Sequence, residues 1–274
     1  MLRRCPSMSI ESKAASWGLS WVVVTGASQG LGAAICQGLA GRLAAGSRIL
    51  GMARSAQGLQ DTGDLVQKVN PDVKFIPHVV DFETASREDL KKIIGGSLKV
   101  ENDPLPSRSV IFHNVGSVGP LDYLQNLKDQ DTVNHYFQLN ISSVVVLNAV
   151  FLEIMSQHPD IAVEVINISS LCGVQPLKSW GLYCAGKAAR DMIFKVLAEE
   201  EPNILVLNYA PGPLDNNMQE IARTLTADKE VRSCFASMKD EGKLIACHVT
   251  VDKLLDLLRG HQFKSGDHVD YYDV

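Results

Sequence analysis

The stretch Thr25-Gly26-Ala27-Ser28-Gln29-Gly30-Leu31-Gly32 decides the fold that this sequence predicts. It follows Trp21-Val22-Val23-Val24, a short β-branched apolar run that predicts a buried parallel strand, and it precedes a helical segment at 33–40. Glycines let a backbone approach a pyrophosphate closely, and a helix N-terminus offers free N–H groups. The spacing G-x-x-x-G-x-G is weak evidence alone, but after a predicted strand it favours a loop that binds the phosphates of a dinucleotide.

Apolar runs alternate with helical segments along the rest of the chain. Strands are predicted at 47–53, 73–80, 109–113, 162–168, 203–209 and 267–271, and helices at 64–69, 86–94, 131–157, 183–201 and 250–259, with a polar helical segment up to about 242. No repeat and no linker rich in Pro, Gly or Ser divides them. We therefore expect a single-domain α/β fold over residues 20–274, a doubly wound Rossmann-type parallel sheet with helices on both faces.

Composition excludes several classes of function. The 274 residues are 46% hydrophobic and have a net charge of −5, which suits a sizeable core and gives no basic surface for nucleic acid or an acidic membrane. No apolar run reaches the roughly 18 residues that a membrane helix needs. The six cysteines show no C-x-x-C pair and no zinc spacing, so we expect no metal site and a reducing, cytoplasmic location. The basic and Ser-containing residues 1–19 favour a flexible tail over a transit peptide.

A tyrosine and a lysine four residues apart, Tyr183 and Lys187, share one face of the predicted helix at 183–201. An ammonium near a phenol lowers the phenol's pKa, so such a tyrosine can donate a proton to a carbonyl oxygen near neutral pH. Ser170, thirteen residues upstream, is placed to hold that oxygen. The spacing Y-x-x-x-K alone favours two residues on a solvated helix face, and only the rest of the chain reverses this interpretation.

Two further polar residues stand at informative places. Arg54 follows the second strand, where an enzyme that uses NAD has an acidic residue for the ribose, and no acid appears before Asp61. Arg54 is suited to a 2′-phosphate, which favours NADPH; the alternative is a surface arginine on a loop. Asn140 lies inside the predicted helix at 131–157, where it either faces solvent or is held for a function.

From about Trp21 to its end, the chain resembles the short-chain dehydrogenase/reductase superfamily, and within it the sepiapterin reductases of tetrahydrobiopterin synthesis. The superfamily loop T-G-x-x-x-G-x-G matches the stretch 25–32. Its active-site Ser, Tyr and Lys match Ser170, Tyr183 and Lys187, and its helix Asn matches Asn140. The closer resemblance to the pterin enzymes lies in the longer blocks 169–172, 183–192, 208–215 and 263–270.

This resemblance implies roles for many residues. The implied catalytic residues are Ser170, Tyr183, Lys187 and Asn140, the last holding a water of a proton relay. The implied cofactor-binding residues are Gly26, Ala27, Ser28, Gln29, Gly30, Leu31, Gly32, Arg54, Ser55, Asp81, Phe82, Asn114, Lys187, Leu214, Asp215, Asn216, Asn217, Met218 and Gln219. Among them, Arg54 and Ser55 would meet the 2′-phosphate, and Asp81 and Phe82 would flank the adenine. The implied substrate-binding residues are Ser170, Tyr183, Gly212 and Asp270.

Asp270 would anchor a pterin, because a carboxylate accepts hydrogen bonds from both the 2-amino group and the neighbouring ring N–H. The alternative is a solvated acid near the C-terminus. Two positions depart from the superfamily pattern. Val115 replaces an alanine and is expected to crowd the cofactor, and Gln29 replaces a frequent arginine, which weakens the preference for NADPH.

The resemblance implies an NADPH-dependent reductase of pterin side-chain ketones such as sepiapterin and 6-pyruvoyl-tetrahydropterin. We expect a homodimer that meets through the helices with Asn140 and Tyr183. Two alternatives stay open: a general NADPH-dependent carbonyl or diketone reductase, and a non-catalytic NADPH-binding regulatory protein. Cys172 and Cys184 flank the site, and we expect them to serve packing.

Overall fold

The computed structural model describes residues 17–98 and 104–274. Most of the predicted N-terminal tail, residues 1–16, lies outside the described residues. Trp17 is buried, and the Arg108 guanidinium lies 3.8 Å from the centroid of its ring. The packed part of the chain has therefore begun by residue 17, three residues earlier than the predicted boundary at 20.

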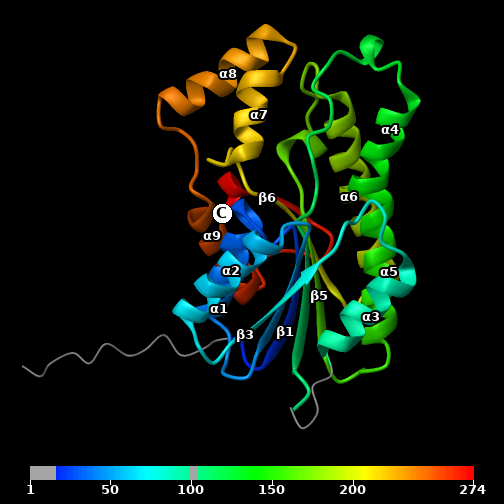
Figure 1. Ribbon diagram of the computed structural model, residues 1–274, viewed down its shortest axis with the longest axis vertical. Coiled ribbons are helices and arrows are strands. Elements are labelled where there is room, and N and C mark those ends of the chain that lie inside the picture. Colours follow the sequence, from blue (N-terminus) through cyan, green and yellow to red (C-terminus); the bar gives the residue numbers. More distant parts are fainter. Residues whose placement is uncertain (1–16, 99–103) are drawn as a thin grey trace, which may run out of the picture.

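Seven parallel strands form one sheet in the order β3-β2-β1-β4-β5-β6-β7 (Figure 1). Their bounds are β1 Ser20–Thr25, β2 Arg48–Ala53, β3 Lys74–Val79, β4 Arg108–His113, β5 Ala162–Ile168, β6 Leu205–Ala210 and β7 His268–Asp270. β1 pairs with β2 on one side and with β4 on the other, so the strand order reverses between β1 and β4. In open α/β sheets this switch point is where ligands bind, at the carboxyl ends of the strands.

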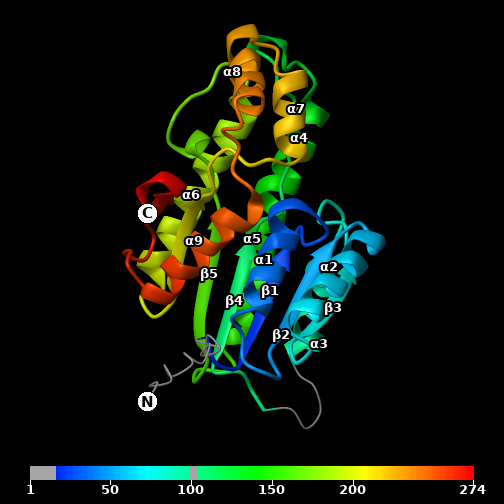
Figure 2. The ribbon, with the colours of Figure 1, turned by 90° about the vertical axis from the view of Figure 1, so that its left-hand side faces the viewer.

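Helices cover both faces of the sheet, which confirms the predicted doubly wound fold (Figure 2). One face packs against α1 (Gly30–Ala40), α2 (Ala56–Val69) and α9 (Cys247–Gly260), and the other against α3 (Arg87–Leu98), α5 (Ser143–Met155) and α6 (Gly181–Glu200). Every residue of β1 and β2 is buried. A central parallel strand is covered on both faces, and this is why it reads as a continuous apolar run rather than an alternating one.

Several helices are longer than predicted, α2 and α3 among them. α2 begins at Ala56 rather than at residue 64, because the Ser55 side chain caps it by accepting a hydrogen bond from the Gly58 N–H at 3.1 Å. α3 continues through Gly95 and Gly96 to Leu98, so the predicted glycine stop is wrong. Leu98 is buried in the core, and this burial offsets the low helix propensity of the two glycines.

The predicted long helix at 131–157 is broken in the middle. α4 (Gln130–Phe137) passes into a π-helical turn, η2 (Gln138–Ser142), and then into α5. Within the described residues, this helical stretch is long and apolar enough to cross a membrane by length and composition, with a mean hydropathy of 1.6. Polar residues interrupt its apolar run, and Leu147 and Phe151 are fully buried against the sheet. α5 is thus a core helix of this domain.

The polar segment before residue 242 forms two helices, α7 (Asn217–Leu225) and α8 (Lys229–Asp240). Figures 1 and 2 show them together beyond the carboxyl edge of the sheet, at the same end as α4. Asn216 caps α7 and Asp228 caps α8, each through its side-chain oxygen. α7 and α8 therefore make a wall over the end of the sheet where the candidate residues gather.

Candidate active site

A cavity of about 910 Å³ lies at the carboxyl edge of the sheet, under α7 and α8. The loops after β4, β5 and β6, the start of α6 and the C-terminal strand β7 all contribute to its lining. It includes the predicted residues Leu31, Asn114, Ser170, Tyr183, Lys187, Gly212, Leu214, Asn216, Met218, Gln219 and Asp270. Residues from six segments of the sequence thus meet in one place, as parallel strands ending at one edge require.

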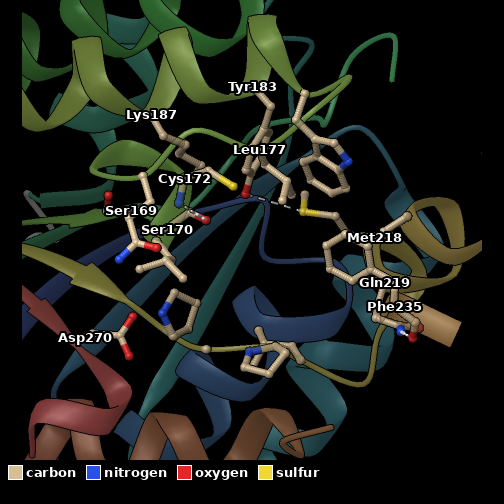
Figure 3. Close-up of a pocket in the computed structure, with 18 of the residues that line it drawn as sticks. Ser169, Ser170, Cys172, Leu177, Tyr183, Lys187, Met218, Gln219, Phe235 and Asp270 are labelled. Atoms are coloured by element: carbon tan, nitrogen blue, oxygen red, sulfur yellow. Dashed lines mark hydrogen bonds between the residues drawn. The ribbon is translucent and has the colours of Figure 1, made fainter. Parts of the chain in front are cut away.

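Ser170, Tyr183 and Lys187 lie together in this cavity (Figure 3). α6 begins at Gly181, which puts Tyr183 in its first turn and Lys187 one turn later on the same face. The Lys187 Nζ donates a hydrogen bond to the Ile168 carbonyl at 2.7 Å and lies 5.6 Å from the centroid of the Tyr183 ring. The Ser170 hydroxyl caps the short helix η3 (Leu171–Gly173) by accepting a hydrogen bond from the Cys172 N–H at 3.2 Å.

Burial controls the ionisation of the tyrosine and the lysine. It raises the pKa of the Tyr183 phenol above its ordinary value, and the hydrogen bond with Ser170 offsets this only in part. Burial, reinforced by repulsion from Arg190, lowers the pKa of Lys187 to about 7. The prediction that the neighbouring ammonium lowers the phenol's pKa is therefore wrong here, because removal from water disfavours the charged form of each group.

Asn140 is buried rather than solvated, in the π-helical turn η2. Its Oδ1 accepts a hydrogen bond from the Ser117 N–H at 2.9 Å, and its Nδ2 donates to the Tyr136 carbonyl at 2.8 Å. The side chain thus fixes the loop after β4 to the helix. Both of its polar atoms are used inside the protein, and the predicted contact with a relay water stays a prediction.

In the glycine loop, the backbone segments at Gly26 and Gly32 lie in close contact. Gly26 and Gly30 adopt positive φ angles of 67° and 54°. A Cβ on Gly32 would lie 2.1 Å from the Gly26 carbonyl oxygen, so no larger residue fits there. The N-cap residue of α1, Gln29, makes no side-chain capping hydrogen bond. The first N–H groups of α1 therefore lack a side-chain partner, and a phosphate is the kind of group that such a helix end binds.

Thr25 and Asn114 join the glycine loop to the loop after β4. The Thr25 hydroxyl accepts hydrogen bonds from the N–H groups of Asn114 and Val115, both at 3.0 Å. The Asn114 Nδ2 donates to the Thr25 carbonyl at 2.8 Å. Thr25 had no predicted role beyond the motif. Its position at the end of β1, next to β4, is the feature that explains this cross-link.

The residues predicted around the adenine end lie outside the cavity. Arg54 is exposed at the end of β2, and the Ser55 hydroxyl is engaged as the cap of α2. The Asp81 carboxylate accepts a hydrogen bond from the Glu83 N–H at 3.0 Å. The Phe82 side chain is buried in the core cluster beneath α3 and α5. Its ring therefore packs against the core, and only its main chain is placed at the edge of the sheet.

The predicted stretch 214–219 mostly supports the wall of the cavity. Lys239 and Asp215 form an ion pair at 2.9 Å, and the Gln219 Nε2 donates to the Phe235 carbonyl at 2.8 Å. Asp215 and Asn217 do not line the cavity, whereas Met218 does. Figure 3 shows Met218 facing Tyr183, and its sulfur lies 3.9 Å from the phenol oxygen.

Asp270, on β7, also lines the cavity, and Figure 3 shows it apart from Tyr183. Figure 3 shows its carboxylate directed toward the part of the cavity that Ser169 and Ser170 line. One oxygen accepts a hydrogen bond from the Tyr272 N–H at 3.0 Å and caps the short helix η4 (Tyr271–Asp273). Nearby, Gly212 has a φ of 76°, a conformation that side chains other than glycine rarely adopt.

A buried polar network that the sequence did not predict lies beneath the cavity. Arg190 on α6 donates from Nε to the Asn167 side chain at 2.8 Å, from Nη1 to the Val115 carbonyl at 2.9 Å, and from Nη2 to the His113 carbonyl. One buried guanidinium thus joins α6 to β4 and β5. Its spacing of three residues from Lys187 would have placed it on the same helix face, but nothing in the sequence names its partners.

The sequence model described as short chain dehydrogenase matches residues 20–226. Sepiapterin reductase of Rattus norvegicus is 40% identical over 94% of this chain and 98% of its own, and that of Xenopus tropicalis is 41% identical over 92% and 95%. A benzil reductase of Bacillus cereus, which forms (S)-benzoin, is 27% identical over 91% and 98%.

Solved structures show the same fold. The KRED1-Pglu enzyme aligns with a TM-score of 0.78 and 27% identity, covering 91% of this chain and all of its own. A short-chain dehydrogenase from Shigella flexneri, solved in complex with NADP, aligns with a TM-score of 0.74 and 20% identity, over 95% of this chain and all of its own.

Proposed function

The chain belongs to the short-chain dehydrogenase family, a family of oxidoreductases, and we propose that it reduces side-chain ketones of pterins with NADPH. The proposed substrates are sepiapterin and 6-pyruvoyl-tetrahydropterin, which places the reaction in tetrahydrobiopterin synthesis. Among its relatives are sepiapterin reductases at about 40% identity, and the chain spans nearly all of their length. These relatives support the substrate class.

The observation that supports this function best is the content of the one cavity at the sheet edge. Ser170, Tyr183 and Lys187 lie at one place in it, and Asp270 lies at another. A substrate whose ketone lies near the Tyr183 phenol would have its far edge facing the Asp270 carboxylate. A pterin has this pattern, because its 2-amino group and ring N–H form a donor edge opposite the side chain.

The residues present fit a bound dinucleotide. The cradle at Gly26 and Gly32 would hold the pyrophosphate, and Arg54 would meet the 2′-phosphate that distinguishes NADPH. When bound, NADPH supplies the hydride. Gln29 offers no charge to the 2′-phosphate, so Arg54 is proposed to provide most of the discrimination. Lys187 would contact the nicotinamide ribose.

The proton chemistry follows from burial. With a raised pKa, Tyr183 stays a protonated phenol at neutral pH, which is the form that a proton donor needs. Ser170 would hold the ketone oxygen beside it. Once the proton has left, the phenolate would lie near the buried Arg190, whose charge favours negative charge on the phenol oxygen. Such preorganised charge stabilises a developing anion without reorganisation.

A general reductase of aryl diketones is the second candidate. Large apolar side chains, Leu177, Trp180, Val231 and Phe235 among them, line the side of the cavity under α7 and α8. The benzil reductase relatives also favour this candidate. An apolar diketone would use the catalytic residues and this wall, but it has no donor edge for Asp270.

Replacing Asp270 separates the two candidates. We expect Asp270→Asn to raise the KM for sepiapterin about tenfold or more, because the carboxylate contributes charge-assisted hydrogen bonds. The KM for phenylpropanedione, a small diketone, is expected to stay within about twofold of the original value, since that diketone has no N–H donor. Initial rates of NADPH oxidation with each substrate provide the measurement. An equal change for both substrates would remove the support for a pterin site.

We also propose a homodimer in the cytoplasm. The exposed apolar side chains of α5 and α6, with Val145 41% and Met192 60% exposed, favour a partner copy on that face. The cysteines of the described residues, Cys36, Cys172, Cys184, Cys234 and Cys247, are free thiols. Free thiols are typical of proteins in reducing compartments.

A further inference from the structure

One face of α6 carries two buried basic side chains close to the proposed proton donor. Tyr183, Lys187 and Arg190 are separated by four and three residues, so they lie along one stripe of the helix. Lys187 is 8% exposed and lines the cavity, whereas Arg190 is 1% exposed and does not line it. The helix thus holds one basic group at the cavity and a second one deeper in the core.

Neither basic side chain forms an ion pair with a carboxylate in the part of the chain that the structure describes. The Lys187 Nζ donates to a main-chain carbonyl at 2.7 Å, and Arg190 donates only to carbonyl and amide oxygens. Asp191, the acidic residue that follows Arg190, instead contacts the Nδ1 of His268 at 2.7 Å. A buried positive charge without a paired carboxylate is costly, and two such charges near each other also repel.

The chemistry of the two groups decides which of them gives up its charge. A guanidinium keeps its proton in proteins, whereas a lysine ammonium readily releases its proton when it is buried. The directions of the two pKa values agree with this rule. Burial, reinforced by repulsion from Arg190, lowers the pKa of Lys187 to about 7, and burial lowers the pKa of Arg190 only to about 10. At neutral pH the arginine is therefore charged, while the lysine is divided between its two forms.

The guanidinium of Arg190 is held in one place. Its three hydrogen bonds go to the end of β4, to the loop after it and to a side chain of β5. A Cβ on Gly116 would lie 3.8 Å from its Nη1, so this loop runs past the guanidinium. Asn114 and Gly116 of the same loop line the cavity. The charge is thus fixed beneath the cavity, and a fixed charge stabilises a developing anion without reorganisation.

Other titratable groups face the two basic side chains from the neighbouring elements. Burial raises the pKa of the Tyr136 phenol on α4, and it raises the pKa of the Cys172 thiol on η3 to about 12. Burial, with repulsion from the guanidinium, lowers the pKa of His113 on β4 to about 3. These three groups are therefore neutral near pH 7. Asp191 and its partner His268 on β7 stay unchanged in every variant below.

We propose that Arg190 is a positioning residue whose guanidinium carries the permanent positive charge of this site and favours the neutral amine of Lys187. This inference deepens the proposed function and rests on it for the effect on the reaction rate. Arg190 acts through Tyr183, because its charge favours the phenolate that forms when the phenol gives its proton to the ketone. It acts through Lys187, because it repels the ammonium. Neither effect needs a contact between Arg190 and the substrate.

Two substitutions separate the charge of Arg190 from its structural contacts. Arg190→Gln removes the charge and keeps an amide donor. Arg190→Lys keeps a positive group, but one that can lose its proton. Arg259→Gln, at a position on α9 whose side chain is 55% exposed, is the matched control. Thermal unfolding of each variant shows first that it is folded.

The first readout is kcat for sepiapterin with NADPH between about pH 6 and 9, relative to the unmodified protein at the same pH. We expect Arg190→Gln to lower kcat about tenfold or more throughout this range, because the phenolate loses a fixed charge. Arg190→Lys should keep most of the rate near pH 6 and approach Arg190→Gln near pH 9, because a buried lysine releases its proton as pH rises. Arg259→Gln should behave as the unmodified protein at every pH.

The second readout follows the charge of Lys187 without any substrate. The difference in melting temperature between each protein and its Lys187→Met derivative is measured as a function of pH. In the unmodified protein this difference should begin to change above about pH 7. In Arg190→Gln the change should begin about one pH unit higher, because the ammonium is no longer repelled. In Arg259→Gln it should begin where it does in the unmodified protein.

The outcomes distinguish this inference from the proposed function. If the unmodified protein does not reduce sepiapterin, the proposed function fails, and the second readout still decides whether Arg190 acts on Lys187. The same starting pH in Arg190→Gln and the unmodified protein, or an unchanged kcat in Arg190→Gln, would overturn the inference. If Arg190→Gln does not fold, the pH profile of Arg190→Lys decides. An equal loss of rate in Arg190→Lys at every pH, or failure of both variants to fold, would assign Arg190 a structural role only.

Discussion

At the scale of single residues, the site depends on groups that are kept out of water. Tyr183 is 7% exposed and Lys187 is 8% exposed. Burial shifts the pKa of the phenol upward and that of the ammonium downward, so both neutral forms are favoured. A proton donor that is neutral at rest, with the charged Arg190 near enough to favour the phenolate after transfer, suits the reduction of a ketone.

Tyr183→Phe tests the proton donor. The ring still packs against Trp180, whose centroid lies 5.2 Å from it, so we expect the fold to be retained. Loss of a positioned acid typically lowers the rate by about 10²–10⁴, and we expect kcat with sepiapterin to fall by this range. NADPH affinity, measured by fluorescence titration, should be unchanged. Turnover that persists near the original rate would show that another group supplies the proton.

Lys187→Met tests the buried ammonium through stability. Below about pH 7 the folded and unfolded states are both protonated, and the folded state has the full penalty of a buried charge. From about pH 7 to 10.5 the unfolded state holds more protons, so the stability of the unmodified protein rises with pH. The methionine variant lacks this rise.

The difference in melting temperature between Lys187→Met and the unmodified protein should therefore be constant below pH 7. It should move in favour of the unmodified protein between pH 7 and 10.5. Thermal scans at closely spaced pH values measure it. A difference that does not depend on pH in this interval would mean that the folded and unfolded states have the same lysine pKa.

Residue identities in the site were predictable from the sequence where spacing determines geometry. Tyr183 and Lys187 had to share a helix face, and Ser170 had to stand at the end of a strand. The direction of the tyrosine pKa was not predictable, because it depends on how deeply α6 and the wall of α7 and α8 bury the phenol. The buried, unpartnered polar atoms of Ser169 and His268 were also not predictable, since the segments that bury them are distant in the sequence.

At the scale of elements, the conformation and close contacts of the backbone determine which side chains each position can hold. The π-helical turn η2 (Gln138–Ser142) interrupts one predicted helix and turns Asn140 into the core. Such turns are frequent at functional sites. Periodicity alone predicted a continuous helix, because the apolar residues of α4 and α5 keep a helical spacing on both sides of the turn.

Gly32→Ala tests the glycine loop. Its Cβ would lie 2.1 Å from the Gly26 carbonyl oxygen, and a backbone atom cannot yield as the tip of a side chain does. We expect about 1–3 kcal/mol of lost stability, as for overpacked sites. Movement of the loop should weaken NADPH binding about tenfold or more, by the loss of backbone phosphate contacts.

Gly96→Ala is the matched control on an exposed helix. Nothing lies within 4 Å of the added Cβ, so we expect a gain of about 0.4–1 kcal/mol in stability and unchanged NADPH affinity. Calorimetry and fluorescence titration measure both variants. Unchanged NADPH binding in Gly32→Ala would place the dinucleotide elsewhere.

At the scale of the whole molecule, the doubly wound parallel sheet was predictable because strands and helices alternate throughout the chain. The placement of α7 and α8 was not predictable, because they pack on the loops rather than on the sheet. The same whole-molecule view explains the apolar stretch Gln130–Met155 as a core helix with one face left exposed.

The proposed dimer predicts the size of the particle in solution. Sedimentation at micromolar concentration should give twice the chain mass of 29.8 kDa. Val145→Glu, at a position 41% exposed on α5, should shift the particle to a monomer, because it places a charge in the proposed apolar interface. Val69→Glu, 42% exposed at the end of α2 on the other face, is the matched control. A monomer for the unmodified protein would contradict the proposal.

The central claim is that this protein reduces a pterin ketone with NADPH, and the loss of sepiapterin's visible absorbance tests it most directly. Purified protein is mixed with sepiapterin and either NADPH or NADH. Rapid loss with NADPH and slow loss with NADH is the predicted result. Equal rates would contradict the role of Arg54 in cofactor choice. No loss with either cofactor, together with activity on phenylpropanedione, would contradict the pterin claim and favour the diketone reductase.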